Sequence, residues 1–488
     1  MDLSVLPDRR ADYDPLGPAV ADHDADLNNA EFLDAVQCAG SMLRSRGVSA
    51  DDVVAVMLPD TAALVVSLFA AWRLGAAVTP INPSRRPTEV RYQLADAAAK
   101  VLIAQTKPGF DTGTAEVVTV QELAGGDPNL DLRPDGRHED RRALLIYTSG
   151  TTGHPKGVVL DHANLDAMCH SVADAFGLTQ NDHSLLILPT FYVNGIVVGT
   201  LPPLLAGGRI TVAGRFNANT FFPRIEKTRA TYFSAVPMIL TMLCGLPEDV
   251  ETDTSSVRFA LCGAAPAASE VLRRFESRYR IPVIEGYGLT EGSCASTANP
   301  LHGKRKPGTV GLPLPGQKIR LGDLSGRSVA PGEAGEIMIK GANVMRGYLN
   351  RPEETAKAIV DGWLHTGDIG RFDEDGYLTI VDRAKNVIIR GGESIYPREI
   401  ESVAYQLPQI AEAAVVGRPN PAHGEEPVLF VSMHKAEVLS TDQIREHLYA
   451  VLSEHKVPVE ITVVQRLPRN AIGAIDRPSL RRLSAHAG

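Results

Sequence analysis

The sequence predicts an α/β protein with a large N-terminal layered α/β domain and a smaller α+β C-terminal domain on a hinge. Three observations support this prediction. The chain has 488 residues, several times the ~100 to 200 residues of a typical single domain. Short β-branched runs alternate with segments of helical period from Val53 onward. After about Gly316 the pattern changes to strands punctuated by Gly and Asp, with far less helix.

The alternation in the N-terminal region indicates parallel βαβ units. The run VVAVMLP at 53–59 is followed by the helical pattern DTAALVVSLFAAWRLG at 60–75 and then by AAVTPINP at 76–83. The same rhythm returns in SLLILP, RITVAG, ATYFSAVP, RFALCGAAP and IPVIEGYG, each followed by a helix or turn pattern. A layered region with parallel strands is therefore expected.

The C-terminal region is predicted to contain one helix from Pro397, a strand pair around AAVVG and PVLFVSM, and a second helix from Thr441. A strand pattern pauses on charged residues just before this region. We therefore predict an N-terminal domain over 1–382, a hinge over 383–385 and a mobile C-terminal domain over 386–488. A surface turn inside one domain is the alternative explanation for the same hinge residues.

Composition and charge restrict the class of protein. Lys and Arg total 49 against 58 Asp and Glu, a net charge of −9, which excludes a basic nucleic-acid footprint. The five cysteines are widely spaced and form no Cys-x-x-Cys pair for zinc or redox chemistry. The N-terminus lacks the apolar stretch of a secretory signal, and the longest apolar run, Ala62–Trp72, is too short for a membrane span. We expect a soluble, cytoplasmic protein without membrane insertion; no oligomeric state is predicted.

The strongest local motif is TSGTTGHPKG, which follows the strand-like run ALLIY. Its glycines allow backbone N–H groups to approach phosphate oxygens, its hydroxyls donate hydrogen bonds, and its lysine adds charge. It is not a Walker loop, because Gly157 rather than Ser or Thr follows the lysine. A flexible surface loop is the alternative. The candidate polyphosphate ligands are Thr148, Ser149, Gly150, Thr151, Thr152, Gly153 and Lys156.

A second motif, EGYGLTEG at 285–292, follows the run IPVI. A dinucleotide-binding turn is the alternative reading, but its third glycine is misplaced for that fingerprint. Three further segments accompany it along the chain: CGAAP at 262–266, GWLHTGD at 362–368 and DRAKN at 382–386.

The order and spacing of these segments resemble the adenylate-forming superfamily of acyl-CoA synthetases, luciferases and peptide-synthetase adenylation domains. The resemblance implies that Thr148–Gly157 is the phosphate loop, that Thr290 contacts phosphate and that Glu291 helps to bind magnesium. It assigns the adenine site to Gly263, Ala264 and Ala265 beside Tyr287, and ribose contacts to Asp368 and Arg383. Glu285 and Gly286 are further candidate cofactor-binding residues. It also makes Lys385 the hinge residue and Gly391 and Gly392 the lining of the pantetheine channel. Without it, Asp368 would be read as a turn or cap residue and Gly391–Gly392 as a hairpin turn.

The sequence departs from the family pattern at two positions. In PTFYVNG, Tyr192 stands where the family often has histidine beside the substrate carboxylate, so Tyr192 is expected in the substrate pocket. In LPRNAIGAIDR, Ala474 occupies the position of the family's adenylation lysine. Loss of one such preorganised contact typically costs a factor of about 10² to 10³ in rate.

The resemblance therefore implies an ATP-dependent carboxylic acid–CoA ligase that uses ATP, Mg²⁺ and coenzyme A, forms an acyl-AMP intermediate and is impaired in adenylation by Ala474. Two alternatives remain open: an adenylating enzyme that loads a carrier protein, and a nucleotide- or acyl-binding regulator without turnover. The small residues Gly286 and Gly288 favour a medium-chain or aromatic acid, but the individual acid is not predicted.

Overall fold

The computed structural model describes residues 1–130, 132–134, 136–148, 155–248, 252–265, 267–323, 326–390, 393–421, 423–434, 439–469 and 475–485, without the side chain of residue 385. The chain forms two compact units. The larger contains Met1–Arg320, Met338–Thr366 and Gly376–Leu378; the smaller contains Leu321–Ile337, Gly367–Asp375 and Thr379–Gly488. The boundary thus passes through several strands, and the hinge at 383–385 stays a prediction.

The first sheet of the larger unit has seven strands. Their spatial order is β18 (Gly347–Tyr348), β8 (Lys156–Asp161), β7 (Arg142–Thr148), β4 (Ala77–Pro80), β3 (Val53–Met57), β5 (Val101–Ala104) and β6 (Glu116–Thr119). Strand β3 pairs in parallel with β4 and β5, as the βαβ rhythm predicts. The β7–β8 and β8–β18 pairs are antiparallel. This reversal brings residue 156, at the start of β8, beside Thr148 at the end of β7.

Helices cover this sheet because their apolar residues recur at helical spacing. The nearly apolar helix α3 (Ala62–Arg73) packs against α2 (Asn29–Ser45), where the Phe32 and Phe69 rings lie 5.6 Å apart. A capping box at Asn28 and Glu31 begins α2. The other helical elements in this part of the chain are η1 (Leu3–Val5), α1 (Leu6–Tyr13), α4 (Pro87–Asp96), α5 (Val120–Leu123) and α6 (His162–Phe176).

The second sheet of the larger unit has nine strands. Their order is β15 (Leu312–Pro313), β14 (Thr297–Ala298), β13 (Val283–Tyr287), β12 (Phe259–Cys262), β11 (Tyr232–Ala235), β9 (His183–Leu186), β10 (Arg209–Val212), β1 (Pro18–Ala21) and β2 (Asp26–Asn28). The strands from β13 through β10 to β1 are parallel. Helices α7 (Val193–Val197), α8 (Leu201–Leu205) and α12 (Pro352–Ala358) and the turn η2 (Thr290–Gly292) also belong to this unit.

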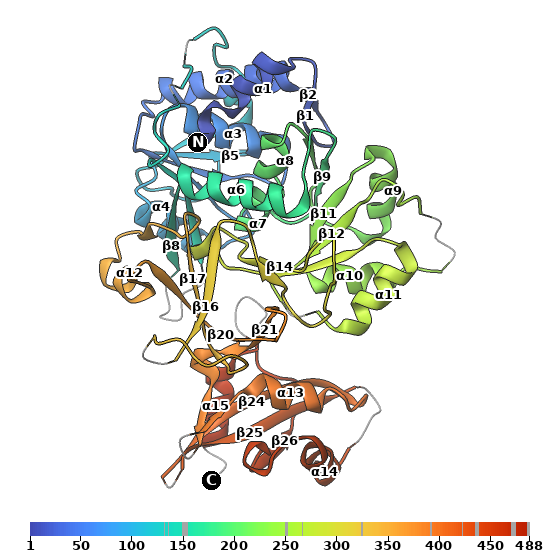
Figure 1. Cartoon of the computed structure of the whole chain (residues 1–488). Coiled ribbons are helices and arrows are strands. Elements are labelled where there is room, and N and C mark those ends of the chain that lie inside the picture. Colours follow the sequence, from blue (N-terminus) through green and yellow to red (C-terminus); the bar gives the residue numbers. More distant parts are fainter. Residues whose placement is uncertain are drawn as a thin grey trace. The chain divides into compact units, whose positions relative to one another are not determined.

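A large hydrophobic core lies between this sheet and helices α9 (Ala218–Thr228), α10 (Pro237–Cys244) and α11 (Ser269–Tyr279), which Figure 1 shows beside β11 and β12. Helix α11 buries Leu272, Phe275 and Tyr279, which share one helical face at intervals of three and four residues. Phe221 and Phe233 meet edge to face, with centroids 4.9 Å apart. Each fully buried Phe contributes about 1.5 to 3 kcal/mol to folding.

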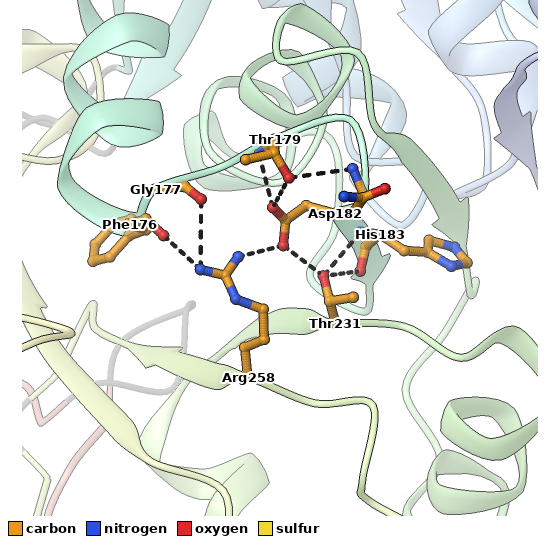
Figure 2. A network of polar contacts seen from close by, with 8 residues as sticks. Phe176, Gly177, Thr179, Asp182, His183, Thr231 and Arg258 are labelled. Carbon is orange, nitrogen blue, oxygen red and sulfur yellow. Dashed lines mark hydrogen bonds and ion pairs between the residues drawn. The ribbon is translucent and has the colours of Figure 1, made fainter.

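A polar network closes the amino ends of three parallel strands (Figure 2). Asp182, Thr231 and Arg258 each directly precede a strand, β9, β11 and β12 respectively. The Asp182 carboxylate accepts hydrogen bonds from Arg258 Nη1 at 2.5 Å and Thr231 Oγ1 at 2.9 Å. It also accepts from the Thr179 backbone N–H at 2.8 Å. Arg258 Nη2 donates to the Phe176 carbonyl at the end of α6, so the network joins one helix to three strands.

A third sheet has the order β16 (Gln317–Gly322), β17 (Gly335–Gly341), β20 (Trp363–Phe372) and β19 (Ile359–Val360), with β21 (Leu378–Arg383) paired to β20. These strands fall where the sequence pattern loses its helices. The short turn η3 (Ala384–Asn386) follows β21.

The smaller unit contains a fourth sheet, ordered β23 (Glu393–Ile395), β22 (Ile388–Arg390), β25 (Gly424–Met433) and β24 (Ile410–Asn420), with β26 (Glu460–Val463) parallel to β25. Alternate residues of β24 face two separate cores, because successive side chains of a strand point to opposite faces. Val415 packs with α13 (Pro397–Ala404) and α14 (Thr441–Val451), whereas Val416 packs with α15 (Arg477–Ala485). The turn η4 (Glu454–Lys456) completes the helical elements described.

The predicted fold class is confirmed: a mixed α/β chain has a large N-terminal and a smaller C-terminal domain. Among the described residues, no helix combines the length and apolarity needed to cross a membrane.

Candidate functional site

Several predicted site segments lie at the carboxyl ends of the parallel strands of the nine-stranded sheet. Gly263–Ala265 follow β12, Glu285–Tyr287 end β13, and Tyr192 comes shortly after β9. In open α/β sheets, ligands bind at this edge. The structure brings the two predicted adenine segments together, because a Cβ added at Gly263 would lie 3.3 Å from the Gly286 carbonyl oxygen. Ala264 has a φ of 66°, a left-handed conformation that an L-residue adopts only when its surroundings require it.

Glu285 is the titratable group of this edge. It pairs across the sheet with Cys262, and its carboxylate accepts one hydrogen bond, at 3.2 Å, from the Gly308 backbone N–H. Burial raises the pKa of Glu285 to about 7, a shift that the Gly308 hydrogen bond opposes. The side chain therefore changes charge near neutral pH, which is a frequent property of ligand-binding sites.

Lys156 begins β8, and its ammonium contacts a carboxylate and an aromatic ring. It forms an ion pair with Glu354, in the first turn of α12, and it lies over the Tyr348 ring, 5.0 Å from the centroid. The Lys156 side chain is 17% exposed and that of Glu354 is 32% exposed. The cation is thus held in a defined position by a carboxylate and an aromatic face.

Glu291 lies in η2, next to Thr290. The Tyr348 hydroxyl donates a hydrogen bond to Glu291 Oε1 at 2.8 Å, and the Met345 backbone N–H donates to the Glu291 carbonyl at 2.8 Å. Burial and the neighbouring carboxylates Glu291 and Glu354 raise the pKa of Tyr348, which remains a hydrogen-bond donor at neutral pH. Tyr348 therefore contacts both predicted charged residues, Lys156 and Glu291.

The site offers magnesium one oriented carboxylate, that of Glu291. A Mg²⁺ ion uses oxygen ligands and often takes only one or two carboxylates, with substrate phosphates and waters completing its shell. Glu291 supplies one such carboxylate, oriented by Tyr348. No cluster of three or more His, Cys, Asp or Glu side chains capable of holding a metal occurs in the described part of the chain.

Tyr192 is 59% exposed, and its ring packs against Phe191 with centroids 4.7 Å apart. Asp60, in the loop before α3, holds the preceding turn because it accepts from both Thr190 N and Thr190 Oγ1, at 2.7 and 2.6 Å. The substrate role of Tyr192 stays a prediction, but the segment that carries it is firmly anchored.

The two predicted ribose residues meet within the smaller unit. Asp368 on β20 is buried, and its Oδ1 lies 3.0 Å from Nε of Arg383 at the end of β21. The Arg383 side chain is largely exposed. An acceptor carboxylate beside an exposed guanidinium is suited to ribose hydroxyls.

The remaining predicted residues lie outside the described residues. They are Ser149, Gly150, Thr151, Thr152, Gly153, Gly391, Gly392 and Ala474, together with the side chain of Lys385.

Sequence reasoning missed Tyr348, Glu354 and Asp60. Tyr348 and Glu354 belong to the segment GYLNRPEET, whose Pro352 begins a short helix. That helix start was the only local signal, and it does not reveal a contact with a lysine almost 200 residues earlier.

Known proteins resemble the chain over almost its whole length. The family model for AMP-binding enzymes matches residues 7–349, and the model for the AMP-binding enzyme C-terminal domain matches residues 399–474. A feruloyl-CoA synthase from Amycolatopsis is 35% identical over 98% of both chains. An oxalate–CoA ligase from Arabidopsis thaliana is 34% identical over 92% of both.

Solved structures agree with these matches. ATP-bound MatB from Rhodopseudomonas palustris superposes with a TM-score of 0.89 at 30% identity over 98% of both chains. An o-succinylbenzoate CoA synthetase from Bacillus subtilis, solved with ATP and a magnesium ion, has a TM-score of 0.86 at 30% identity, covering 98% of this chain and 99% of that one. The same enzyme was also solved with its acyl-adenylate intermediate, with a TM-score of 0.87. The resemblance inferred from the motifs is confirmed: this chain belongs to the family of AMP-binding enzymes.

Proposed function

We propose that this chain is an ATP-dependent carboxylic acid–CoA ligase that works through an acyl-AMP intermediate, with ATP, Mg²⁺ and coenzyme A as its cofactors and cosubstrates. The observation that carries the proposal is the cluster of Lys156, Tyr348 and Glu291, which presents one ammonium and one oriented carboxylate around a shared tyrosine. CoA ligases among the relatives, and solved relatives bound to ATP, magnesium or an acyl-adenylate, support it.

In the first half-reaction the substrate carboxylate attacks the α-phosphate of ATP and pyrophosphate leaves. The Lys156 ammonium would hold phosphate oxygens and offset the repulsion between two anions. A magnesium ion held by Glu291 would neutralise phosphate charge. In the second half-reaction the CoA thiol loses its proton to solvent and its sulfur attacks the acyl carbon, and AMP departs with the electrons of the broken acyl–phosphate bond.

The roles of the other predicted residues are part of the proposal. Thr148 and Thr290 would bind phosphate, Gly263–Ala265 and Glu285–Tyr287 the adenine, and Asp368 with Arg383 the ribose. Tyr192 would line the acid pocket. We also propose a cytoplasmic location, because the five cysteines are free thiols, which persist in reducing compartments.

Ala474 limits this activity at one step in our proposal. The lysine expected there would stabilise charge that develops at the α-phosphate, so its absence should slow acyl-AMP formation by a factor of about 10² to 10³. The second step starts from acyl-AMP already made and should be little affected.

Single-turnover measurement of each half-reaction, in the parent chain and in Ala474→Lys, tests the proposal. We expect Ala474→Lys to accelerate pyrophosphate release strongly and to leave thioester formation from supplied acyl-AMP and CoA nearly unchanged. Ala474→Gln serves as the control for side-chain size without charge. Equal first-step rates in all three proteins would contradict the proposed impairment. Transfer to carrier proteins but not to free CoA would contradict the CoA ligase assignment.

A further inference from the structure

The segment formed by β18 and α12 contacts both charged residues of the proposed nucleotide site. Tyr348 on β18 places its ring under the Lys156 ammonium and donates its hydroxyl hydrogen to Glu291. Glu354 on α12 forms the ion pair with Lys156. None of the motifs that predicted the site includes this segment.

Backbone contacts fix the segment to the strand that carries Lys156. Tyr348 pairs with Val158 of β8, and the Leu349 backbone N–H donates to the Gly157 carbonyl at 2.8 Å. Thr355 Oγ1 accepts a hydrogen bond from the Tyr348 backbone N–H at 2.9 Å and so ties α12 to β18. Glu354 is therefore held at a fixed place beside Lys156, unlike most surface carboxylates, whose ion pairs cost side-chain entropy to form.

The ion pair changes the local charge that an approaching anion encounters at Lys156. Together Lys156 and Glu354 carry no net charge, and both side chains are mostly buried, so solvent screens their interaction less than that of an exposed pair. A phosphate that approaches the ammonium is repelled by the carboxylate already bound there. A phosphate can contact the Lys156 ammonium fully only when the Glu354 carboxylate moves away from it.

We propose that Glu354 is a positioning residue that competes with the phosphates of ATP for the ammonium of Lys156. In the nucleotide-free chain Glu354 keeps the lysine in place and neutralised. ATP displaces the carboxylate when it binds, and Glu354 recaptures the ammonium when the phosphates leave, which speeds product release. This inference rests on the proposed function, because ATP is the competing anion.

Calorimetric titration with MgATP, without acid or CoA, tests this competition in the full chain. Glu354→Gln keeps the shape of the side chain and removes its charge. We expect Glu354→Gln to bind MgATP at least about 10-fold more tightly, since two unit charges about 4 Å apart change the affinity by a factor of about 5 even at the dielectric constant of water and by more at a partly buried site. Structural damage would weaken binding rather than tighten it.

Two control variants accompany this measurement. Glu353→Gln removes the same charge from the adjacent, exposed position of α12 and should leave the affinity unchanged. Glu354→Asp keeps the charge and should retain the weaker affinity of the parent. A Kd for Glu354→Gln that equals or exceeds that of the parent would overturn the inference, as would an equal gain in Glu353→Gln.

The variant Lys156→Ala separates failure of the inference from failure of the proposed function. If the parent binds MgATP and Lys156→Ala binds it more weakly, the phosphate role of Lys156 holds and Glu354→Gln alone decides the inference. If the parent binds no MgATP, or Lys156→Ala binds it equally well, the proposed nucleotide site is wrong and the inference fails with it.

Discussion

Two charged clusters of the larger unit differ in how completely their charges are satisfied. The Asp182 carboxylate is 3% exposed and accepts hydrogen bonds from three side chains, those of Thr179, Thr231 and Arg258, and from the Thr179 backbone N–H. The Lys156 and Glu354 side chains are 17% and 32% exposed, and each charge balances only the other in the contacts observed. The first arrangement holds the fold together, whereas the second leaves charges that a ligand can take over.

The difference follows from position in the sheets. Asp182, Thr231 and Arg258 stand at the amino ends of parallel strands, where close connections must pack tightly (Figure 2). Most candidate site residues follow the carboxyl ends, where loops diverge and leave room for a ligand. In the nine-stranded sheet the Asp182 network and the predicted adenine segments thus lie at opposite edges, whereas the Lys156 cluster belongs to the seven-stranded sheet, where Lys156 begins β8.

The largest expected effect is on stability, at the amino edge. Asp182→Ala should lower the free energy of unfolding by about 3 kcal/mol, because the Thr179 N–H and the Thr231 hydroxyl lose their buried charged acceptor and a hydrogen bond to a charged group contributes about 1.5 to 3 kcal/mol. Denaturant unfolding measures this change. Asp174→Ala, on an exposed position of α6, is the matched control and should cost less than about 0.5 kcal/mol. Similar losses in both variants would show that the Asp182 network is not a structural centre.

The second prediction concerns the Lys156 cluster, where we expect a large effect on MgATP affinity and a small effect on stability. Lys156→Ala should weaken MgATP binding on the order of 10- to 100-fold, since a hydrogen bond to a charged group contributes about 1.5 to 3 kcal/mol. Its free energy of unfolding should change less than that of Asp182→Ala, because the Glu354 carboxylate, 32% exposed, can reach water when its lysine is removed. Calorimetry and denaturant unfolding on the same samples measure both quantities. If Lys156→Ala lost much stability and bound MgATP as tightly as the parent, the Lys156 cluster would be structural, like the Asp182 network.

Much of the fold, but less of the site, could be predicted from local sequence. The β-branched run at Val53–Met57 and the apolar helix that follows it have periodic signals, and the structure confirms them. The division of the strands between a seven-stranded and a nine-stranded sheet has no local signal, because pairs such as β1 with β10 join residues far apart in the chain. Glu354 and Arg258 were missed for the same reason. Their roles depend on partners that only the folded chain brings near.

A third prediction concerns acid stability near the amino edge. Nδ1 of His183 lies 2.9 Å from the Thr228 carbonyl and must donate to it, so Nε2 accepts from Thr211 Oγ1 at 2.7 Å. Burial and the nearby Arg209 charge lower the pKa of His183 from 6.5 to about 4, a shift that the Thr228 hydrogen bond opposes. As pH falls through this interval the unfolded chain binds a proton that the folded chain does not, and stability decreases.

This loss should reach about 2 kcal/mol between pH 7 and pH 5. Denaturant unfolding at both values measures it, with His183→Gln as the variant that should lose less stability on acidification. His162 is also buried with a pKa of about 4 and adds to the acid sensitivity of every variant. If the free energy of unfolding depended on pH equally in the parent and in His183→Gln, groups other than His183 would cause the acid sensitivity.

The last prediction has the opposite sign and belongs to the carboxyl edge. Burial raises the pKa of Glu285 from 4.5 to about 7, and the Gly308 N–H hydrogen bond opposes this shift. Between these pH values the unfolded chain has released a proton that the folded chain retains, so stability falls as pH rises and then levels above pH 7. Glu285→Gln retains an oxygen that can accept from Gly308 and removes the titration. It should therefore be more stable than the parent at pH 8 and closest to it near pH 4.5, as thermal unfolding across this range will measure. If the stability difference between Glu285→Gln and the parent stayed the same from pH 4.5 to 8, the buried Glu285 carboxylate would not destabilise the fold. The carboxyl edge would then not differ from the stabilising amino edge in this respect.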